Sequence, residues 1–148
     1  MMGKRLVLAG LGLLLAVTVR AGEPEVQYHA SDPDLRLPFS DAVRVGDMLY
    51  LSGQIGTLPG TTQLAKGGIA GETRQTMENI KASLEKYGSS LDRVVKCTVF
   101  LADIGEWAAM NEVYRAYFPA NPPARSALGA SGLALGARVE IECLATVR

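Results

Sequence analysis

Apolar residues along the chain follow two periods, one typical of strands and one typical of helices. Runs of apolar and β-branched residues flank Gly46-Asp47 and predict a hairpin over 41–52. Residues 94–101 and 138–146 form longer apolar runs and predict two further strands. The first of these is apolar almost throughout, as expected for a central strand covered on both faces. A short strand is also expected at 26–28.

Two helices are expected where apolar residues recur at steps of three and four. The first covers about 72–87 and ends before Gly88. The second begins with a capping-box-like Asp103 and ends before Pro119. Core packing is the expected role of the two apolar stripes, which are Met77, Ile80, Leu84 and Tyr87 on the first helix and Trp107, Met110, Tyr114 and Tyr117 on the second.

The order strands, helix, strand, helix, strand predicts an α+β domain with one sheet. Each strand–helix–strand step fits a crossover within that sheet, so both helices are expected on one face. The opposite face would be left apolar. A bare apolar face of this kind is usually buried against another subunit.

The N-terminal segment has the layout of a secretory signal peptide. Lys4 and Arg5 precede an uncharged run over 6–19, and Val19-Arg20-Ala21 offers small residues where a signal peptidase cleaves. The run is shorter than the roughly 20 residues of a membrane-spanning helix. We therefore expect a cleaved signal peptide over 1–21, which leaves no membrane association and a periplasmic or secreted protein. The alternative is an uncleaved N-terminal anchor. The rest divides into a polar linker over 22–37 and a domain over 38–148.

Removal of the first 21 residues changes the charge balance. Three of the 15 basic residues lie there, which leaves 12 against 15 acidic residues and a net charge of −3. A slightly acidic domain is a poor candidate for nucleic-acid binding. Export would place Cys97 and Cys143 in an oxidising compartment, where they either pair or stay free. His29, the only histidine, falls in the linker without a partner at ligand spacing, so no metal site is expected.

Two features of the sequence could carry chemistry. Arg125 is expected in a loop after the second helix, where Pro122-Pro123 stiffens the backbone. A guanidinium there suits a carboxylate, and a surface salt bridge is the alternative. Glu140 and Glu142 point to one face of the last strand. On a central strand Glu140 would be partly buried and suited to proton transfer; on an edge strand it would belong to a solvated acidic face.

These residues belong to a longer series of motifs. From about Pro38 to the C-terminus the sequence resembles the reactive intermediate deaminase (Rid, or RidA-like) family, with the family's spacing throughout. The motifs that carry the resemblance are Ser52-Gly53-Gln54-Ile55, Glu78-Asn79-Ile80, Val95-Lys96-Cys97-Thr98-Val99-Phe100-Leu101, Met110-Asn111-Glu112-Val113-Tyr114, Pro123-Ala124-Arg125-Ser126, Leu133 and Val139-Glu140-Ile141-Glu142.

The resemblance implies a chorismate-mutase-like α+β subunit with two helices on one face of a mixed sheet, in a homotrimer with sites between subunits. It implies no cofactor. By that resemblance Arg125 binds the substrate carboxylate and Glu140 positions or activates water. Phe39, Ser52, Gly53, Asn111 and Ala127 would complete the pocket. Two positions depart from the family: Ala127 replaces a cysteine of well-known members, and Phe39 stands where tyrosine is often found.

The implied reaction is that of a 2-iminobutanoate/2-iminopropanoate-type deaminase, which hydrolyses 2-imino acids, the tautomers of enamines, to 2-keto acids and ammonium. One alternative is a non-catalytic trimeric binder of small carboxylates in the periplasm. A second alternative is RNA cleavage, prompted by ribonuclease activity reported in the family. The acidic composition of residues 22–148 argues against RNA.

Overall fold

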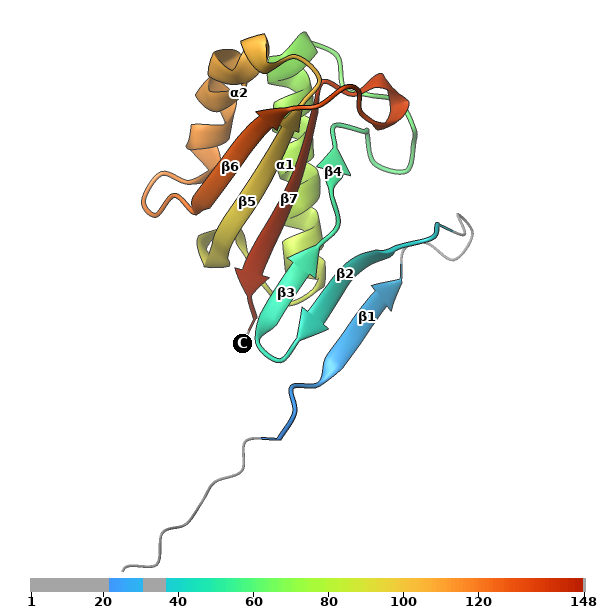
Figure 1. Cartoon of the computed structure of the whole chain (residues 1–148), viewed down its shortest axis with the longest axis vertical. Helices are drawn as coiled ribbons and strands as arrows, with labels where there is room; N and C mark the ends of the chain where they lie inside the picture. Colours follow the sequence, from blue (N-terminus) through green and yellow to red (C-terminus); the bar gives the residue numbers. More distant parts are fainter. Residues whose placement is uncertain (1–21, 31–36, 148) are drawn as a thin grey trace, which may run out of the picture.

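The computed structural model describes residues 22–30 and 37–147, so the predicted signal peptide lies outside the described residues. One mixed sheet runs through the molecule in the order β1-β2-β3-β7-β5-β6, and β4 pairs with β7 beside β3 (Figure 1). All neighbouring strands are antiparallel except β5 and β6, which are parallel and joined through α2. The strands are β1 Val26–Ala30, β2 Ser40–Val45, β3 Met48–Leu51, β4 Gln54–Ile55, β5 Val94–Leu101, β6 Ala124–Gly129 and β7 Val139–Thr146.

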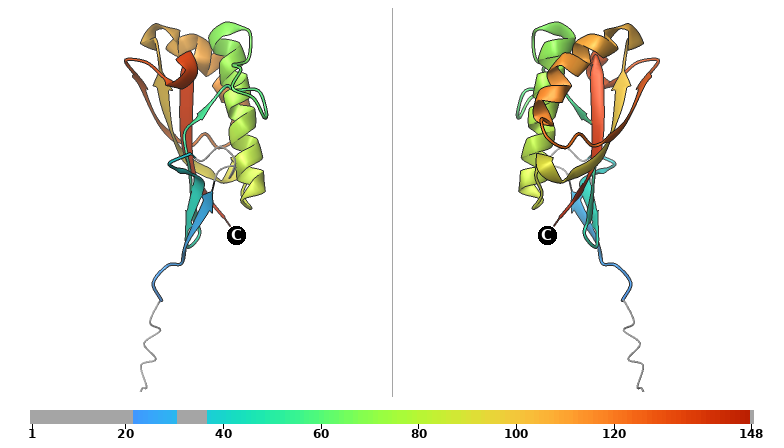
Figure 2. Two further views of the ribbon diagram at one scale, coloured as in Figure 1. Left: turned by 90° about the vertical axis from the view of Figure 1, so that its right-hand side faces the viewer. Right: turned by 90° about the vertical axis from the view of Figure 1, so that its left-hand side faces the viewer.

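Both α-helices of residues 22–30 and 37–147 pack on one face of this sheet, and in this part of the chain the other face carries no helix (Figure 2). They are α1, Gly68–Lys86, and α2, Trp107–Tyr114. The α+β prediction and the placement of both helices on one face are therefore confirmed. Short 3₁₀ turns connect these elements: η2 Leu91–Arg93, η3 Ile104–Glu106, η4 Arg115–Tyr117 and η5 Ala134–Gly136.

The core lies between α1, α2 and the covered face of the sheet. Met77, Ile80 and Leu84 are fully buried on α1, as predicted, and they meet the inward residues of β5 and β7. Alternation along β7 is strict: Val139, Ile141, Cys143 and Ala145 are buried and the residues between them are partly exposed. The central strands therefore present one apolar face to the helices and a second, mixed face to the outside.

The helix α1 begins four residues before its predicted start at residue 72. Gly67 and Gly68 carry positive φ values of 107° and 62°, which only glycine adopts without strain. The pair reverses the chain directly into the helix, and Ile69 is buried in the first turn. The two glycines therefore form the helix start.

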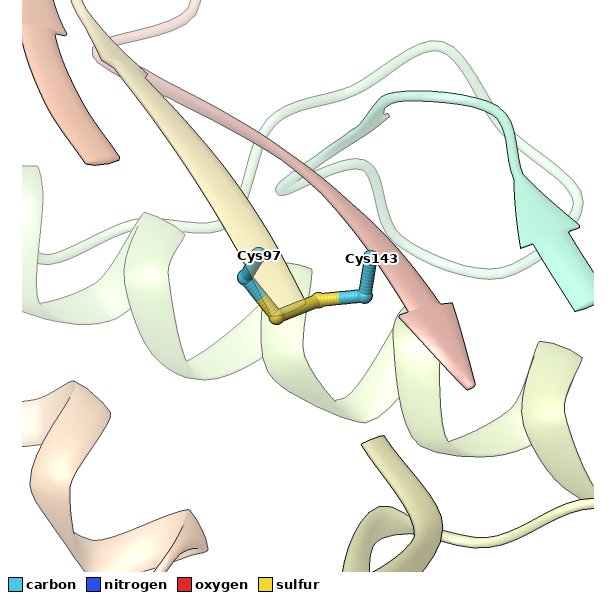
Figure 3. Close-up of a disulfide and its surroundings, with 2 residues drawn as sticks. All are labelled: Cys97 and Cys143. Carbon is cyan, nitrogen blue, oxygen red and sulfur yellow. A yellow bond between two sulfur atoms is a disulfide. The ribbon is translucent and has the colours of Figure 1, made fainter. Parts of the chain in front are cut away.

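The two cysteines form a disulfide between the central strands β5 and β7 (Figure 3). Cys97 and Cys143 face each other in the antiparallel register, with their Cα atoms 4.1 Å apart. Both side chains are fully buried beneath α1. The question that the sequence left open is thus settled in favour of pairing.

The strand β1 extends the sheet on the β2 side and includes the single histidine. Val26–Ala30 confirms the short strand expected at 26–28. His29 stacks on Tyr87, at the C-terminal end of α1, with ring centroids 4.5 Å apart. Tyr87 in turn donates a hydrogen bond to Asp41 on β2. His29, expected in the linker without a partner at ligand spacing, thus lies in a strand that pairs with β2 and stacks on an aromatic ring.

Candidate functional site

Arg125 lies on the edge strand β6, and the prediction of a loop at this position is wrong. Pro122-Pro123 and the small residues that follow hide the strand in the sequence, because they lack β-branched side chains. The strand forms by pairing in parallel with β5, where Arg125 is the partner of Cys97. Because Cys97 is buried under the helices, Arg125 leaves the sheet on the helix-covered side.

The guanidinium of Arg125 rests on one face of α2. Its Nη1 donates a hydrogen bond to Asn111 Oδ1 at 2.6 Å. Its Cζ lies 4.8 Å from the centroid of the Tyr114 ring and 5.8 Å from that of Trp107. Positions 107, 111 and 114 lie on the same side of the helix, since they are four and three residues apart. Asn111, expected among the residues that complete the pocket, is thus a direct partner of Arg125.

Among the described residues, Asn111 is the only hydrogen-bond partner of Arg125, which leaves Nε and Nη2 available. An open pocket of about 530 Å³ adjoins the guanidinium, and its walls include Tyr114, Phe118 and Pro123 together with a second cation, Arg115. Ala127 lies two residues further along β6, on the same face as Arg125, opposite Val99 of β5. A pocket with apolar walls and a partly free guanidinium suits a small molecule that carries a carboxylate.

Tyr114 contributes a buried hydroxyl that finds no hydrogen-bond partner among the described residues. Burial raises the pKa of Tyr114 to about 12, and the nearby Arg125 charge offsets part of that rise. The phenol therefore stays protonated over the physiological range, and its ring faces the guanidinium as a neutral aromatic surface.

Glu140 lies on the outer face of the sheet, within the central strand β7. Its register partner on β5 is Phe100, and its neighbours Val139 and Ile141 are fully buried on the helix side. The expectation of a partly buried Glu140 on a central strand is confirmed, since its exposure is intermediate. Glu142 lies on the same face, opposite Thr98.

The loop after β3 brings Gly53 directly against Glu140. A Cβ atom at Gly53 would lie 2.1 Å from Glu140 Oε1, so only glycine leaves this carboxylate in place. The preceding residue Ser52 donates a hydrogen bond from its Oγ to the carbonyl of Ser40 at 2.6 Å. This bond ties the loop to the start of β2, where the neighbouring Phe39 is half exposed. Ser52, Gly53 and Glu140 thus form one group, with Phe39 next to its anchor.

The start of β7 is held by two carboxylates, Glu72, which the sequence did not single out, and Glu106, the second residue of the predicted capping box. The buried Glu72 of α1 accepts a hydrogen bond from the backbone N–H of Arg138 at 2.7 Å. The side chain of Arg138 pairs with Glu106, at the end of η3. Arg138 therefore links both helical regions to the strand that carries Glu140. The predicted capping box is only partly correct, because Asp103 caps Gly105 while Glu106 makes this pair instead.

The predicted site residues therefore fall into two groups within one chain. Arg125, Asn111 and Ala127 lie on the helix side of the edge strand, and the group of Ser52, Gly53 and Glu140 includes the outer face of β7. Within residues 22–30 and 37–147, no group of three or more His, Cys, Asp or Glu residues is placed to hold a metal ion. No helix in that part of the chain is long and apolar enough to cross a membrane.

Comparison with known proteins identifies the family. A family model described as endoribonuclease L-PSP matches residues 29–147. The chain belongs to this family. A human L-PSP relative named 2-iminobutanoate/2-iminopropanoate deaminase is 44% identical over 108 residues, which cover 73% of this chain and 79% of that protein. An Arabidopsis thaliana relative named Reactive Intermediate Deaminase A, chloroplastic, is 35% identical over 133 residues, or 90% of this chain and 71% of that protein. The resemblance to the reactive intermediate deaminases is thereby confirmed.

Solved structures of L-PSP relatives share the fold. The yeast protein YEO7 superposes with a TM-score of 0.76 at 40% identity and covers 84% of this chain and 100% of its own. The Escherichia coli YjgF gene product superposes with a TM-score of 0.71 at 33% identity, over 82% of this chain and 94% of its own. The chorismate-mutase-like subunit fold expected from the sequence is the fold of these L-PSP proteins.

Trp107 and Tyr114 are the residues of the site that sequence reasoning missed. Both were assigned to core packing because they recur at helical spacing. Tyr114 is buried as expected, but Trp107 is 44% exposed, so its assignment to the core is wrong. The informative signal was the spacing itself, because Trp107, Asn111 and Tyr114 share one helix face with the asparagine of the motif.

Proposed function

We propose that this protein hydrolyses 2-imino acids to 2-keto acids and ammonium. The observation that carries the proposal is the guanidinium of Arg125, fixed on α2 by Asn111 while Nε and Nη2 stay available beside an open pocket. Two parallel N–H groups on one edge of a guanidinium match the two oxygens of a carboxylate. Membership of a family whose human member is named 2-iminobutanoate/2-iminopropanoate deaminase supports this substrate class.

In the proposed reaction, water adds to the imine carbon of the 2-imino acid. A tetrahedral carbinolamine forms, the C–N bond then breaks, and the carbonyl oxygen of the product comes from water. Nitrogen leaves as ammonia and is released as ammonium after protonation. Arg125 would hold the carboxylate, and Glu140 would orient the water and accept its proton. Orientation supplies much of the acceleration, because an imine is already electrophilic. General acid–base help of this kind contributes roughly 10²–10⁴-fold.

The active site proposed here is formed between copies of the chain. Arg125 and Glu140 project from opposite sides of the sheet, so one copy offers each residue to a different neighbour. The outer face includes a row of register partners, Tyr28, Val43, Tyr50 and Leu144, of which Tyr28 is 74% and Tyr50 44% exposed. Apolar surface of this kind is normally covered. A closed homotrimer, in which each outer face meets the edge of the next copy, would place Arg125 of one copy opposite Glu140 of another.

We also propose that the protein acts outside the cytoplasm. The signal-peptide layout of residues 1–21 supports this location. The buried Cys97–Cys143 disulfide supports it independently, since such bonds persist in oxidising compartments. Substrates there would be imines formed or released outside the cytoplasm.

The decisive experiment measures the loss of freshly generated 2-imino acid. An amino-acid oxidase produces the imine from its amino acid, and semicarbazide traps the imine that remains. The protein should lower semicarbazone formation and accelerate keto-acid release, whereas Arg125→Ala should do neither. The matched control is Lys81→Ala, which removes an exposed cation of α1 that does not line this pocket.

The non-catalytic binder predicts a different outcome. The protein would then bind 2-oxobutanoate but would not accelerate the hydrolysis of imines made from several different amino acids. That result would refute the deaminase proposal and leave a carboxylate-binding protein. Loss of turnover with binding retained in Glu140→Gln would favour the enzyme.

A further inference from the structure

We propose that Trp107 is a positioning residue for Arg125, and that the indole sets the affinity for the substrate carboxylate. This inference rests on the proposed function, because it assigns Arg125 to carboxylate binding. It concerns a residue outside the motifs that carry the family resemblance. The exposed indole is also an unexpected feature on a helix whose Met110 and Tyr114 are buried.

The contacts of Arg125 restrain the guanidinium from one side. Asn111 fixes Nη1 through a hydrogen bond, and the Tyr114 and Trp107 rings lie within 6 Å of Cζ, the range of cation–π attraction. Tyr114 is held by burial in the core. Trp107, at 44% exposure, is the more exposed of the two aromatic partners, and it contacts Arg125 without lining the open pocket.

A restrained arginine binds a carboxylate better than a free one. An exposed arginine side chain samples many rotamers and loses that freedom when it binds, which weakens affinity. The indole and the phenol hold the guanidinium in place before the substrate arrives, while Nε and Nη2 stay free among the described residues. Trp107 therefore acts through Arg125 and should influence binding more than the chemical step.

Trp107 also provides its own assay, because it is the only tryptophan of the chain. A carboxylate that binds Arg125 changes the charge balance 5.8 Å from the indole. The intrinsic fluorescence of the protein should therefore change in a saturable way on titration with 2-oxobutanoate, the product of 2-iminobutanoate hydrolysis. The same titration on Arg125→Ala should give no change.

Kinetics of three variants test the positioning role. Trp107→Ala should raise KM and the Kd for 2-oxobutanoate, measured by calorimetry, about two- to fivefold, with kcat unchanged. Trp107→Phe keeps an aromatic face and should recover most of the affinity. Leu58→Ala removes a comparably exposed apolar side chain from a distant loop and should change nothing. In the Arg125→Lys background, Trp107→Ala should have a smaller effect, because the guanidinium that lies over the indole is gone.

The outcomes separate the two proposals. If the native protein neither hydrolyses 2-imino acids nor binds 2-oxobutanoate, the proposed function fails and this inference fails with it. If Arg125→Ala retains native turnover and binding, Arg125 does not hold the carboxylate, and this inference fails while imine hydrolysis stands. If Arg125→Ala is inactive while Trp107→Ala has native KM and Kd, only the positioning role is refuted. A loss in Trp107→Ala that appears in kcat alone, or that Trp107→Phe does not rescue, also refutes it.

Discussion

Arg125 and Glu140 lie on opposite faces of one sheet. The covered face is marked by Cys97 on β5, the partner of Arg125, and by Ile141 on β7, the neighbour of Glu140; both are fully buried. Since side chains alternate along a strand, no rotamer change within one copy brings the guanidinium and the carboxylate to a common substrate. A reaction that uses both residues therefore requires two copies.

Mixing two inactive variants tests this requirement directly. Arg125→Ala and Glu140→Gln should each lose nearly all imine hydrolysis. Co-refolded in equal amounts, they should recover about one quarter of native activity, because a site is intact when Arg125 comes from one variant and Glu140 from the other. Keto-acid release from the mixture provides the measurement. A mixture as inactive as its parts would place both residues in sites within one copy, contrary to the geometry.

The contact between Gly53 and Glu140 predicts a variant with a normal fold and low activity. In Gly53→Ala the new Cβ would lie 2.1 Å from Glu140 Oε1, so the carboxylate must swing away. We expect kcat to fall about 10²-fold, the lower end of general acid–base catalysis, with an unchanged circular dichroism spectrum. In the control Gly105→Ala, the added Cβ lies 3.0 Å from the Asp103 carboxylate, away from Glu140, and kcat should stay native. Native activity in Gly53→Ala would contradict a role for the Glu140 position.

The orphan hydroxyl of Tyr114 predicts that its removal costs no stability. Tyr114→Phe should leave the free energy of unfolding unchanged or raise it by about 1 kcal/mol, because the buried O–H has no hydrogen-bond partner among the described residues. Urea unfolding at pH 7 measures the difference. A loss above about 1 kcal/mol would show that the hydroxyl has a partner in solution, such as water.

The raised pKa of Tyr114 also predicts a pH dependence. Its pKa is about 12 in the folded protein against 10.0 as the ordinary value. Between pH 10 and pH 12 the phenol ionises in the unfolded protein but stays protonated in the folded one. Ionisation of Tyr114 therefore has no effect on stability below pH 10 and lowers the free energy of unfolding as the pH rises from 10 to 12. The free energy of unfolding should fall less steeply in Tyr114→Phe than in the native protein. Some slope should remain, since burial also raises the pKa of Tyr117 to about 12. Equal slopes for both proteins would contradict the shift.

The disulfide should contribute substantially to stability. It closes a loop with a sequence separation of 46, and chain-entropy arguments assign about 4 kcal/mol to a loop of that length. The double variant with Cys97→Ala and Cys143→Ala should lose about that amount in urea unfolding. Reductant should leave the native protein unaffected under folding conditions, because both cysteines are fully buried. Rapid reduction of the folded protein would contradict this burial.

Local sequence patterns, that is, residue type and the spacing of apolar residues, predicted most of the fold. The hairpin around Gly46-Asp47, the stripe of Met77, Ile80 and Leu84, and the apolar run of β5 each follow from residue type and spacing. The strand β6 could not be found in this way. Its sequence has low strand propensity, and it forms because β5 offers a free edge after the α2 crossover.

The site was predicted only in part, because strand pairing and register cannot be predicted from local sequence. The types of Arg125 and Glu140 suggested carboxylate binding and proton transfer, and the motif resemblance placed both in one pocket. Their separation across the sheet depends on which side of its strand each residue occupies, and for Arg125 this is fixed by the register with Cys97. Helical spacing alone gave Trp107 and Met110 the same role, although the edge position of α2 leaves Trp107 exposed.

The redox state of Cys97 and Cys143 also depends on the compartment in which each copy of the protein folded. A chain closed into a covalent loop cannot pass in single file through a narrow translocation channel, so an exported copy acquires its crosslink only after crossing. A copy folded in a reducing compartment would seal two free thiols beneath α1, out of reach of later oxidants. The fraction of molecules that carry the disulfide, measured in protein isolated from cells, therefore reports how many folded in an oxidising compartment.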